Sequence, residues 1–175
     1  MKSLFKTLTL VSVMTFGLNL YAQKFAYVDV EYILNSLPEY KSAQAELDKI
    51  SVQWQKEIES KIAEVDKLYK SYQAEEFLLT EEMKKKRQNE IMMKEKEVKD
   101  LQKQRFGVDG DLFKKRQEMV KPIQDKVYNA IKAVSDKEQI MVMFNKSNDM
   151  NIVYSNPRYD RSETVIDAVK NAKGK

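Results

Sequence analysis

The sequence predicts an α+β protein in which a long antiparallel α-helical coiled-coil hairpin arm stands on a small β base. The stretch from Glu39 to Phe106, about 68 residues, contains neither glycine nor proline, whereas an average globular helix spans about 11 to 12 residues. Glu, Lys, Gln and Leu are abundant in it and favour a helix. Short segments rich in β-forming residues flank it on both sides. An elongated shape therefore carries the function more plausibly than a catalytic pocket does.

The N-terminus has the pattern of a secretory signal peptide over residues 1–22. Lys2 and Lys6 precede an apolar run from residue 8 to residue 20, and Ala22 offers a small residue at the cleavage point. A transmembrane anchor is the competing interpretation. The run is shorter than the roughly 20 residues needed to span a bilayer and lacks a basic flank after it. We therefore expect a mature chain that is exported and soluble.

The composition excludes most catalytic chemistry. The chain has no Cys and no His, so thiol catalysis, disulfides, Ser-His triads and most zinc sites lack their usual groups. Neither of the glycine-rich phosphate-binding motifs is present. We expect no enzyme activity, no cofactor and no bound metal.

Charge differs between the two halves of the predicted arm. Residues 39–79 carry six lysines and nine acidic residues, and residues 81–120 carry twelve basic and nine acidic residues. An acidic helix beside a basic one would be attracted across a hairpin. Two independently solvated faces are the alternative, because an exposed ion pair contributes only about 0 to 1 kcal/mol.

The first element of the mature chain is a predicted strand over residues 25–30, with alternating apolar residues and many β-formers. Pro38 is expected to end it. Pro38 suits the first turn of a helix, where its missing N–H costs nothing, and Ser36 is a candidate cap.

Apolar residues then recur every three or four positions and predict a narrow coiled-coil seam. Repeated four-residue steps around Trp54 to Ile62 predict a stutter that locally unwinds the supercoil. The predicted seam residues are Ala43, Leu47, Ile50, Trp54, Ile58, Ile62, Val65, Tyr69 and Tyr72.

The tip of the arm is predicted near residues 77–82. Thr80 can cap a second helix whose first turn holds Glu81 and Glu82, which suit the positive end of the helix dipole. A single continuous rod is the alternative. We favour the hairpin because a first arm of about 60 Å, at 1.5 Å per residue, needs an antiparallel partner.

Two glycines, Gly107 and Gly110, predict a break or kink in the returning helix. Asp109 and Asp111 beside them invite a calcium interpretation, but the spacing is not that of a calcium-binding loop and the acidic residue at its twelfth position is absent. Helical periodicity resumes at Phe113 and continues to residue 134, with a local bend expected at Pro122.

The last part of the chain predicts a β-hairpin and a final helix. The runs 140–144 and 150–154 are the two strands, joined by a polar turn. Asp160 and Glu163 fit a capping box before an amphipathic helix. Residues 23–37 and 121–175 thus form the base and residues 38–120 the arm. Three short strands cannot bury their own faces and leave open edges, so we expect self-association.

This order of parts resembles the Skp/OmpH family of periplasmic chaperones over essentially the whole mature chain. The resemblance rests on the strand Lys24-Phe-Ala-Tyr-Val-Asp-Val30, the long charged hairpin, the returning helix, the β-hairpin, the loop starting at Tyr154-Ser-Asn and the Asp-capped C-terminal helix. Residues 105–113, followed by Pro122-Ile123, are similar to the version in Bacteroidetes-type members. The resemblance implies a jellyfish-like homotrimer in the periplasm that holds unfolded outer-membrane proteins between its arms without ATP.

For such a function the arm needs many weak, adaptable contacts, which Met and aromatic side chains provide. The candidates for contact with an unfolded client are Tyr69, Tyr72, Phe77, Leu78, Leu79, Met83, Met92 and Met93. Each of them could instead close the seam or the tip of the hairpin.

Two further sets of residues are candidates for interaction. A basic cluster next to the tip could attract acidic clients or anionic lipid head groups, or could be an ordinary solvated helix face; it consists of Lys84, Lys85, Lys86 and Arg87. Core or subunit contacts in the base are expected from Phe25, Tyr27, Val28, Val142, Phe144, Ile152 and Tyr154.

Two other classes of protein compete with this interpretation. An exported coiled-coil adaptor would bind one folded envelope partner through a fixed stripe. Nucleic-acid binding is suggested only by a pI of ≈ 9.0. Export argues against it, and the basic residues alternate with acidic ones instead of forming a stripe, so we expect no nucleic acid.

Overall fold

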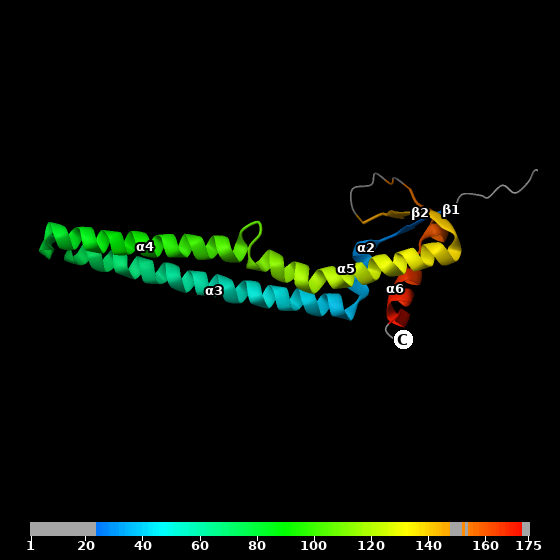
Figure 1. Ribbon diagram of the computed structural model, residues 1–175, viewed down its shortest axis with the longest axis horizontal. Helices are drawn as coiled ribbons and strands as arrows, with labels where there is room; N and C mark the ends of the chain where they lie inside the picture. Colours follow the sequence, from blue (N-terminus) through cyan, green and yellow to red (C-terminus); the bar gives the residue numbers. More distant parts are fainter. Residues whose placement is uncertain (1–23, 148–151, 153, 173–175) are drawn as a thin grey trace, which may run out of the picture.

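The computed structural model confirms an α+β fold with a long helical hairpin on a small base (Figure 1). It describes residues 24–147, 152 and 154–172. The predicted signal peptide lies outside the described residues. In chain order the elements are β1 (Lys24–Val28), α2 (Val30–Ser36), α3 (Pro38–Glu75), the 3-10 turn η1 (Glu76–Leu78), α4 (Glu81–Phe106), α5 (Asp111–Glu138), β2 (Ile140–Asn145), the 3-10 turn η2 (Pro157–Tyr159) and α6 (Ser162–Asn171).

A short helix, α2, separates the first strand from the arm, and the sequence interpretation missed it. β1 ends at Val28, well before Pro38, because the Asp29 carboxylate accepts a hydrogen bond from the Tyr32 N–H at 2.8 Å and caps α2. The predicted Ser36 cap for the next helix is also wrong. Ser36 Oγ donates to the Tyr32 carbonyl within α2, and the N-cap residue of α3 is Leu37, which makes no side-chain cap.

The two long helices α3 and α4 lie side by side and antiparallel (Figure 1). We call α4, the tip and the part of α3 beside α4 the outer arm. The chain reverses through η1 and two further residues, Leu79 and Thr80. Thr80 Oγ1 accepts a hydrogen bond from the Met83 N–H at 3.3 Å, so the predicted cap of α4 is confirmed. The hairpin, and not the continuous rod, is the observed arrangement.

The predicted seam of α3 holds as far as Ile58, and beyond it two of the four predicted positions, Ile62 and Tyr69, are wrong whereas Val65 and Tyr72 are confirmed. Ile62 and Tyr69 are about half exposed, whereas Lys61 and Leu68 turn partly inward. A third consecutive four-residue step would rotate the seam by roughly another 40° around the helix. A three-residue step from Ile58 to Lys61 restores the alignment, and the seam continues through Val65, Leu68 and Tyr72.

The returning limb is interrupted between Phe106 and Asp111, as the two glycines predicted. α5 then carries the chain back to the base and continues through Pro122 without a break. It ends at Gln139, whose positive φ of 57° places it in the left-handed region and turns the chain into β2.

The sheet differs from the predicted β-hairpin. β2 pairs with β1 in parallel, with Phe25 opposite Val142 and Tyr27 opposite Phe144. The second predicted strand falls partly on residues 150, 151 and 153, which lie outside the described residues, and Ile152 and Tyr154 are not in a strand. Within the described part of the chain the sheet therefore has two strands, joined by the entire arm.

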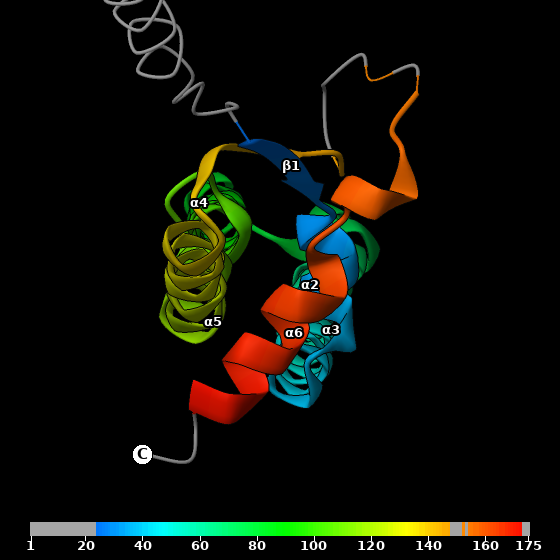
Figure 2. The ribbon, with the colours of Figure 1, turned by 90° about the vertical axis from the view of Figure 1, so that its right-hand side faces the viewer.

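The hydrophobic core lies where the base meets the lower arm, which is formed by α5 and the start of α3. Figure 2 shows α6 crossing this end of the molecule, with α5 on one side and α2 on the other. The most deeply buried side chains are Ile33, Ile166, Val28, Val127 and Val165.

The predicted capping box of the last helix, α6, is wrong. Asp160 precedes the cap and binds Ser162, while Glu163 accepts from the Tyr32 hydroxyl instead of the helix N-terminus.

Candidate functional site

Strongly exposed apolar side chains lie at the tip of the arm. Phe77 and Leu78 lie in η1 and are 80% and 74% exposed, Met83 is half exposed, and Leu79 is half buried. The tight reversal leaves no helix beyond the tip to cover them. The tip therefore presents an aromatic and an aliphatic side chain to solvent at the far end of the molecule.

Further exposed apolar side chains lie along the sides of the outer arm. Met92 and Met93 on α4 are 61% and 65% exposed, and Tyr69 on α3 is about half exposed. Val52 and Ile62, also on α3, are equally exposed and were not among the predicted contact residues. Val52 could have been predicted as exposed, because it lies outside the seam. Ile62 was missed because the sequence interpretation placed it in the seam.

Tyr72 differs from the other predicted contact residues because it is buried, with only 7% of its surface exposed. Its hydroxyl donates to Glu76 Oε1 at 3.2 Å and accepts from Gln88 Nε2 at 2.8 Å. Tyr72 therefore joins α3 to α4 within the hairpin, which confirms its predicted place in the seam.

The predicted basic cluster is divided between the seam and the surface. Lys84 and Arg87 are half buried, whereas Lys85 and Lys86 are exposed. A hydrogen bond to Glu81 at 2.8 Å raises the pKa of Lys84 above its ordinary value. The segment from Glu75 to Arg87 holds four acidic and four basic residues, so its net charge is zero. The cluster is thus not a strong positive patch.

Cationic side chains occupy much of the α4 face that meets α3. Partly or fully buried residues recur there with alternating three- and four-residue steps: Lys84, Arg87, Ile91, Lys94, Val98, Leu101 and Arg105. Four of these seven are basic, and Ile91 is the one that is fully buried. Such a seam excludes water less well than an apolar one, so the outer arm is weakly packed.

Ion pairs follow both patterns considered from the sequence. Arg87 reaches Glu75 at 3.9 Å and Arg105 reaches Glu57 at 3.3 Å across the hairpin. Other pairs of the arm join residues three or four apart on one helix, such as Lys94 with Glu97 at 2.7 Å. Those pairs support each helix singly and leave the contact between the helices weak.

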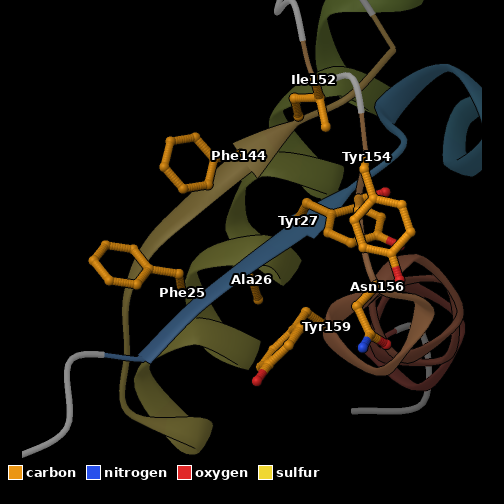
Figure 3. A pocket seen from close by; sticks show the side chains of 9 residues that line it. Phe25, Ala26, Tyr27, Phe144, Ile152, Tyr154, Asn156 and Tyr159 are labelled. Atoms are coloured by element: carbon orange, nitrogen blue, oxygen red, sulfur yellow. The ribbon is translucent and has the colours of Figure 1, made fainter.

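An open aromatic groove lies on the base (Figure 3). In the parallel sheet the pairs Phe25–Val142 and Tyr27–Phe144 project to the same face, because opposite residues share a face. The Phe25 and Phe144 rings stack with centroids 6.3 Å apart. The groove has a volume of ≈ 520 Å³ and is lined by Phe25, Ala26, Tyr27, Phe144, Ile152, Tyr154, Ser155, Asn156 and Tyr159.

The predicted base residues separate into two groups. Tyr27 and Val28 are buried, and Phe144 and Ile152 are half buried. Phe25, Val142 and Tyr154 remain exposed, Tyr154 at 79%. Asn156 fixes the loop beneath the groove, because its side chain accepts a hydrogen bond from the Arg158 N–H at 3.0 Å. The exposed group forms an apolar surface on the base.

A polar network beside this surface joins the start of α6 to the residue that follows β2, Lys146. Asp160 accepts hydrogen bonds from the Ser162 hydroxyl at 2.6 Å, from the Ser162 N–H at 2.9 Å and from Lys146 at 3.2 Å. Partial burial raises the pKa of Asp160, but these hydrogen bonds outweigh it and leave the pKa below its ordinary 3.8.

The described residues contain no group of three side chains suited to hold a metal ion. Asp111, one of the two residues considered for calcium, is bound to Arg105 at 2.7 Å.

Of the helices that the structure describes, none is both long enough and apolar enough to span a bilayer.

The arrangement defines a class of protein: a small base with an exposed apolar face, bearing one long and weakly packed helical hairpin. A family model described as outer membrane protein (OmpH-like) matches residues 24–169, and the chain belongs to this family. A similar solved structure is that of a protein described as an OmpH-like outer membrane chaperone from Caulobacter crescentus CB15. It shares 15% identity, with 86% of this chain and 85% of that chain covered and a TM-score of 0.69. No curated protein matches the sequence.

Proposed function

We propose that this protein is an ATP-independent periplasmic holdase chaperone, which binds unfolded outer-membrane proteins and prevents their aggregation in transit. It would act after export and removal of residues 1–22. The observation that carries the proposal is the set of exposed apolar side chains on the outer arm, most of all Phe77 and Leu78 at the tip. Membership of the OmpH-like family supports it.

The physical chemistry of the arm suits an unfolded client. A chain that exposes apolar strands in many arrangements is held better by many weak contacts than by one deep pocket. Met92 and Met93 are flexible enough to repack against different partners. The weakly packed seam would also let the two helices adjust. Neither of the glycine-rich phosphate-binding motifs occurs in the sequence, which agrees with action without nucleotide.

Self-association through the base is the second part of the proposal. Parallel sheets are usually covered on both faces, yet Phe25, Val142 and Tyr154 are exposed here. A second and a third copy of the chain would cover the aromatic groove and the edge of β2 that pairs with no further strand among the described residues. A homotrimer built this way would project three arms from one base and enclose a space for the client.

The test is light scattering of the mature chain, alone and mixed with a urea-diluted outer-membrane β-barrel protein without ATP. We expect a stable trimer that keeps the barrel protein soluble. The double variant Phe77→Ser, Leu78→Ser should remain trimeric and lose most of this protection. A matched control, Thr164→Ser, changes an exposed residue of the base and should protect fully.

A monomer, or an oligomer that lets the barrel protein aggregate, would contradict the proposal and favour an exported adaptor with one folded partner. Contact with anionic lipid is a separate and weaker prediction. Of the four basic residues 84–87 next to the tip, Lys85 and Lys86 alone are exposed. Co-sedimentation with vesicles containing phosphatidylglycerol, compared with a Lys85→Gln, Lys86→Gln variant, tests it.

A further inference from the structure

The outer arm meets the lower arm at a joint where one limb is broken and the other is continuous. α3 passes the joint without interruption, while the returning limb breaks between Phe106 and Asp111. Figure 1 shows this loop standing out between α4 and α5. A break in one limb alone would leave α3 as the only rigid connection, and the outer arm would be free to bend there.

The loop itself is packed tightly against the end of α4. The Gly107 N–H donates to the Lys103 carbonyl at 2.8 Å, and the Gly110 N–H donates to the Gly107 carbonyl at 2.9 Å. A Cβ atom on Gly107 would lie 2.4 Å from the Lys103 oxygen, and one on Gly110 would lie 2.7 Å from the Gln104 oxygen. Both positions therefore need glycine for close approach, and the loop is not a slack linker.

One guanidinium connects all three helices across this joint. Arg105, near the end of α4, pairs with Asp111 in the first turn of α5 at 2.7 Å and with Glu57 on α3 at 3.3 Å. The Arg105 guanidinium also lies over the Trp54 ring of α3, with 4.7 Å to its centroid. Arg105 and Asp111 are largely shielded from solvent, so their attraction is screened less than that of surface pairs.

One further contact and the planar shape of the guanidinium favour arginine at this position. The Trp54 ring meets the Phe106 ring edge to face, at 6.3 Å between centroids, which fixes the surface on which the guanidinium lies. The Arg105 Nε atom is buried without a hydrogen-bond partner among the described residues. A planar guanidinium can stack on a ring while its two terminal nitrogens reach different carboxylates, which a lysine ammonium cannot do.

We propose that Arg105 is a latch that fixes the direction of the outer arm relative to the base, and that its release lets the outer arm bend at the Gly107–Gly110 joint. Removing the guanidinium leaves the break in the returning limb held only by the loop, by the Gln104–Asp111 hydrogen bond at 3.4 Å and by the Trp54–Phe106 contact among the described residues. Weakening the charge pairs with salt has the same effect to a smaller extent. The latch concerns the arm itself, so its test needs no client and is separate from the test of the chaperone proposal.

The chain provides its own reporter, because Trp54 is its one tryptophan. We would measure acrylamide quenching of Trp54 in the full mature chain and in Arg105→Gln. Release of the guanidinium uncovers the ring, so we expect the quenching constant to rise roughly two-fold. Arg116→Gln, at an exposed position of α5, removes the same charge and should leave quenching unchanged.

A second readout follows the joint directly. The chain has no Cys, so spin labels can be placed at Lys96→Cys on α4 and Lys132→Cys on α5, both exposed. Labelled chains diluted with unlabelled ones report the distance within one arm. We expect one narrow distance distribution in the parent chain and a broad one when Arg105→Gln is added.

Equal quenching and equal distance distributions in Arg105→Gln and Arg116→Gln would overturn the latch. If Arg105→Gln does not fold, the parent chain still gives an answer. Raising the salt to about 1 M shortens the Debye length to about 3 Å, and quenching and the width of the distance distribution should both increase. No change with salt in either quantity would equally overturn the proposal.

Discussion

The base and the outer arm bury their apolar side chains to very different extents. The ten-residue helix α6 buries Val165, Ile166 and Val169, whereas the 26-residue helix α4 buries Ile91 alone. Burial of apolar surface is the main stabilising term in folding. The base therefore holds the fold together, and the outer arm keeps its helices with little tertiary support. We interpret this as a fixed platform carrying an adaptable limb.

The largest expected effect is on the base. Ile166→Ala removes a side chain that is 1% exposed and leaves a cavity between α6 and the core. We expect the free energy of unfolding to fall by about 3 kcal/mol, measured by urea denaturation. Thr164→Ala on the exposed face of the same helix should change it by less than about 0.5 kcal/mol. Similar losses for the two variants would show that α6 is not part of a packed core.

A smaller and more local effect is expected from Ile91→Ala in α4. This side chain is 7% exposed, but its neighbours along the seam are mostly long cationic chains that can relax into the gap. We expect a loss of about 2 kcal/mol, the low end for such a change, measured as faster hydrogen exchange of outer-arm amides alone. Val52→Ala, at a half-exposed position on α3, is the control. Faster exchange in the base as well would mean that arm and base unfold as one unit.

The cap at the tip should contribute less again. Thr80→Ala removes the oxygen that accepts from the Met83 N–H. We expect a loss of about 1 kcal/mol, visible as faster exchange of the first amides of α4 and nowhere else. Thr80→Ser keeps the acceptor and should restore slow exchange. If Thr80→Ala exchanges like the parent, the cap does not set the start of α4.

The smallest effect concerns pH and the polar network of the base. The pKa of Asp160 is lowered in the folded state, so its stabilising contribution is complete above the ordinary pKa of 3.8 and is lost as pH falls below it. Asp160→Asn should therefore flatten the decline of the unfolding midpoint in that acid range. Asp125→Asn, an exposed residue of α5 paired with Lys121, should leave the decline unchanged. If Asp125→Asn flattened the decline more than Asp160→Asn does, the role of Asp160 would be contradicted.

Features that depend on neighbouring residues were predictable from the sequence. The Thr80 cap and the Gly107–Gly110 break follow from local backbone chemistry. Helix α2 was also predictable in principle, because Asp29 is a cap residue and Ile33 and Leu34 follow at helical positions. It was missed because the β-type pattern before it was extended too far.

Features that depend on distant contacts were not predictable. The partner of β2 is β1, on the other side of the whole arm in the sequence, so the hairpin rule favoured the nearby run 150–154 over the parallel pairing that forms. The seam lost its register at Lys61 because a lysine stem can occupy an inward position that the pattern reserved for Ile62. The joint around Arg105 combines residues of three helices, and no local motif indicates it.

Hydrogen exchange of the full mature chain, with and without an unfolded outer-membrane protein, tests the central comparison most directly. We expect slow exchange in the base and fast exchange in the outer arm, with added client slowing exchange around the tip and along α4. Uniform protection throughout the chain, or protection by client confined to the base, would contradict the account of a fixed platform with an adaptable limb.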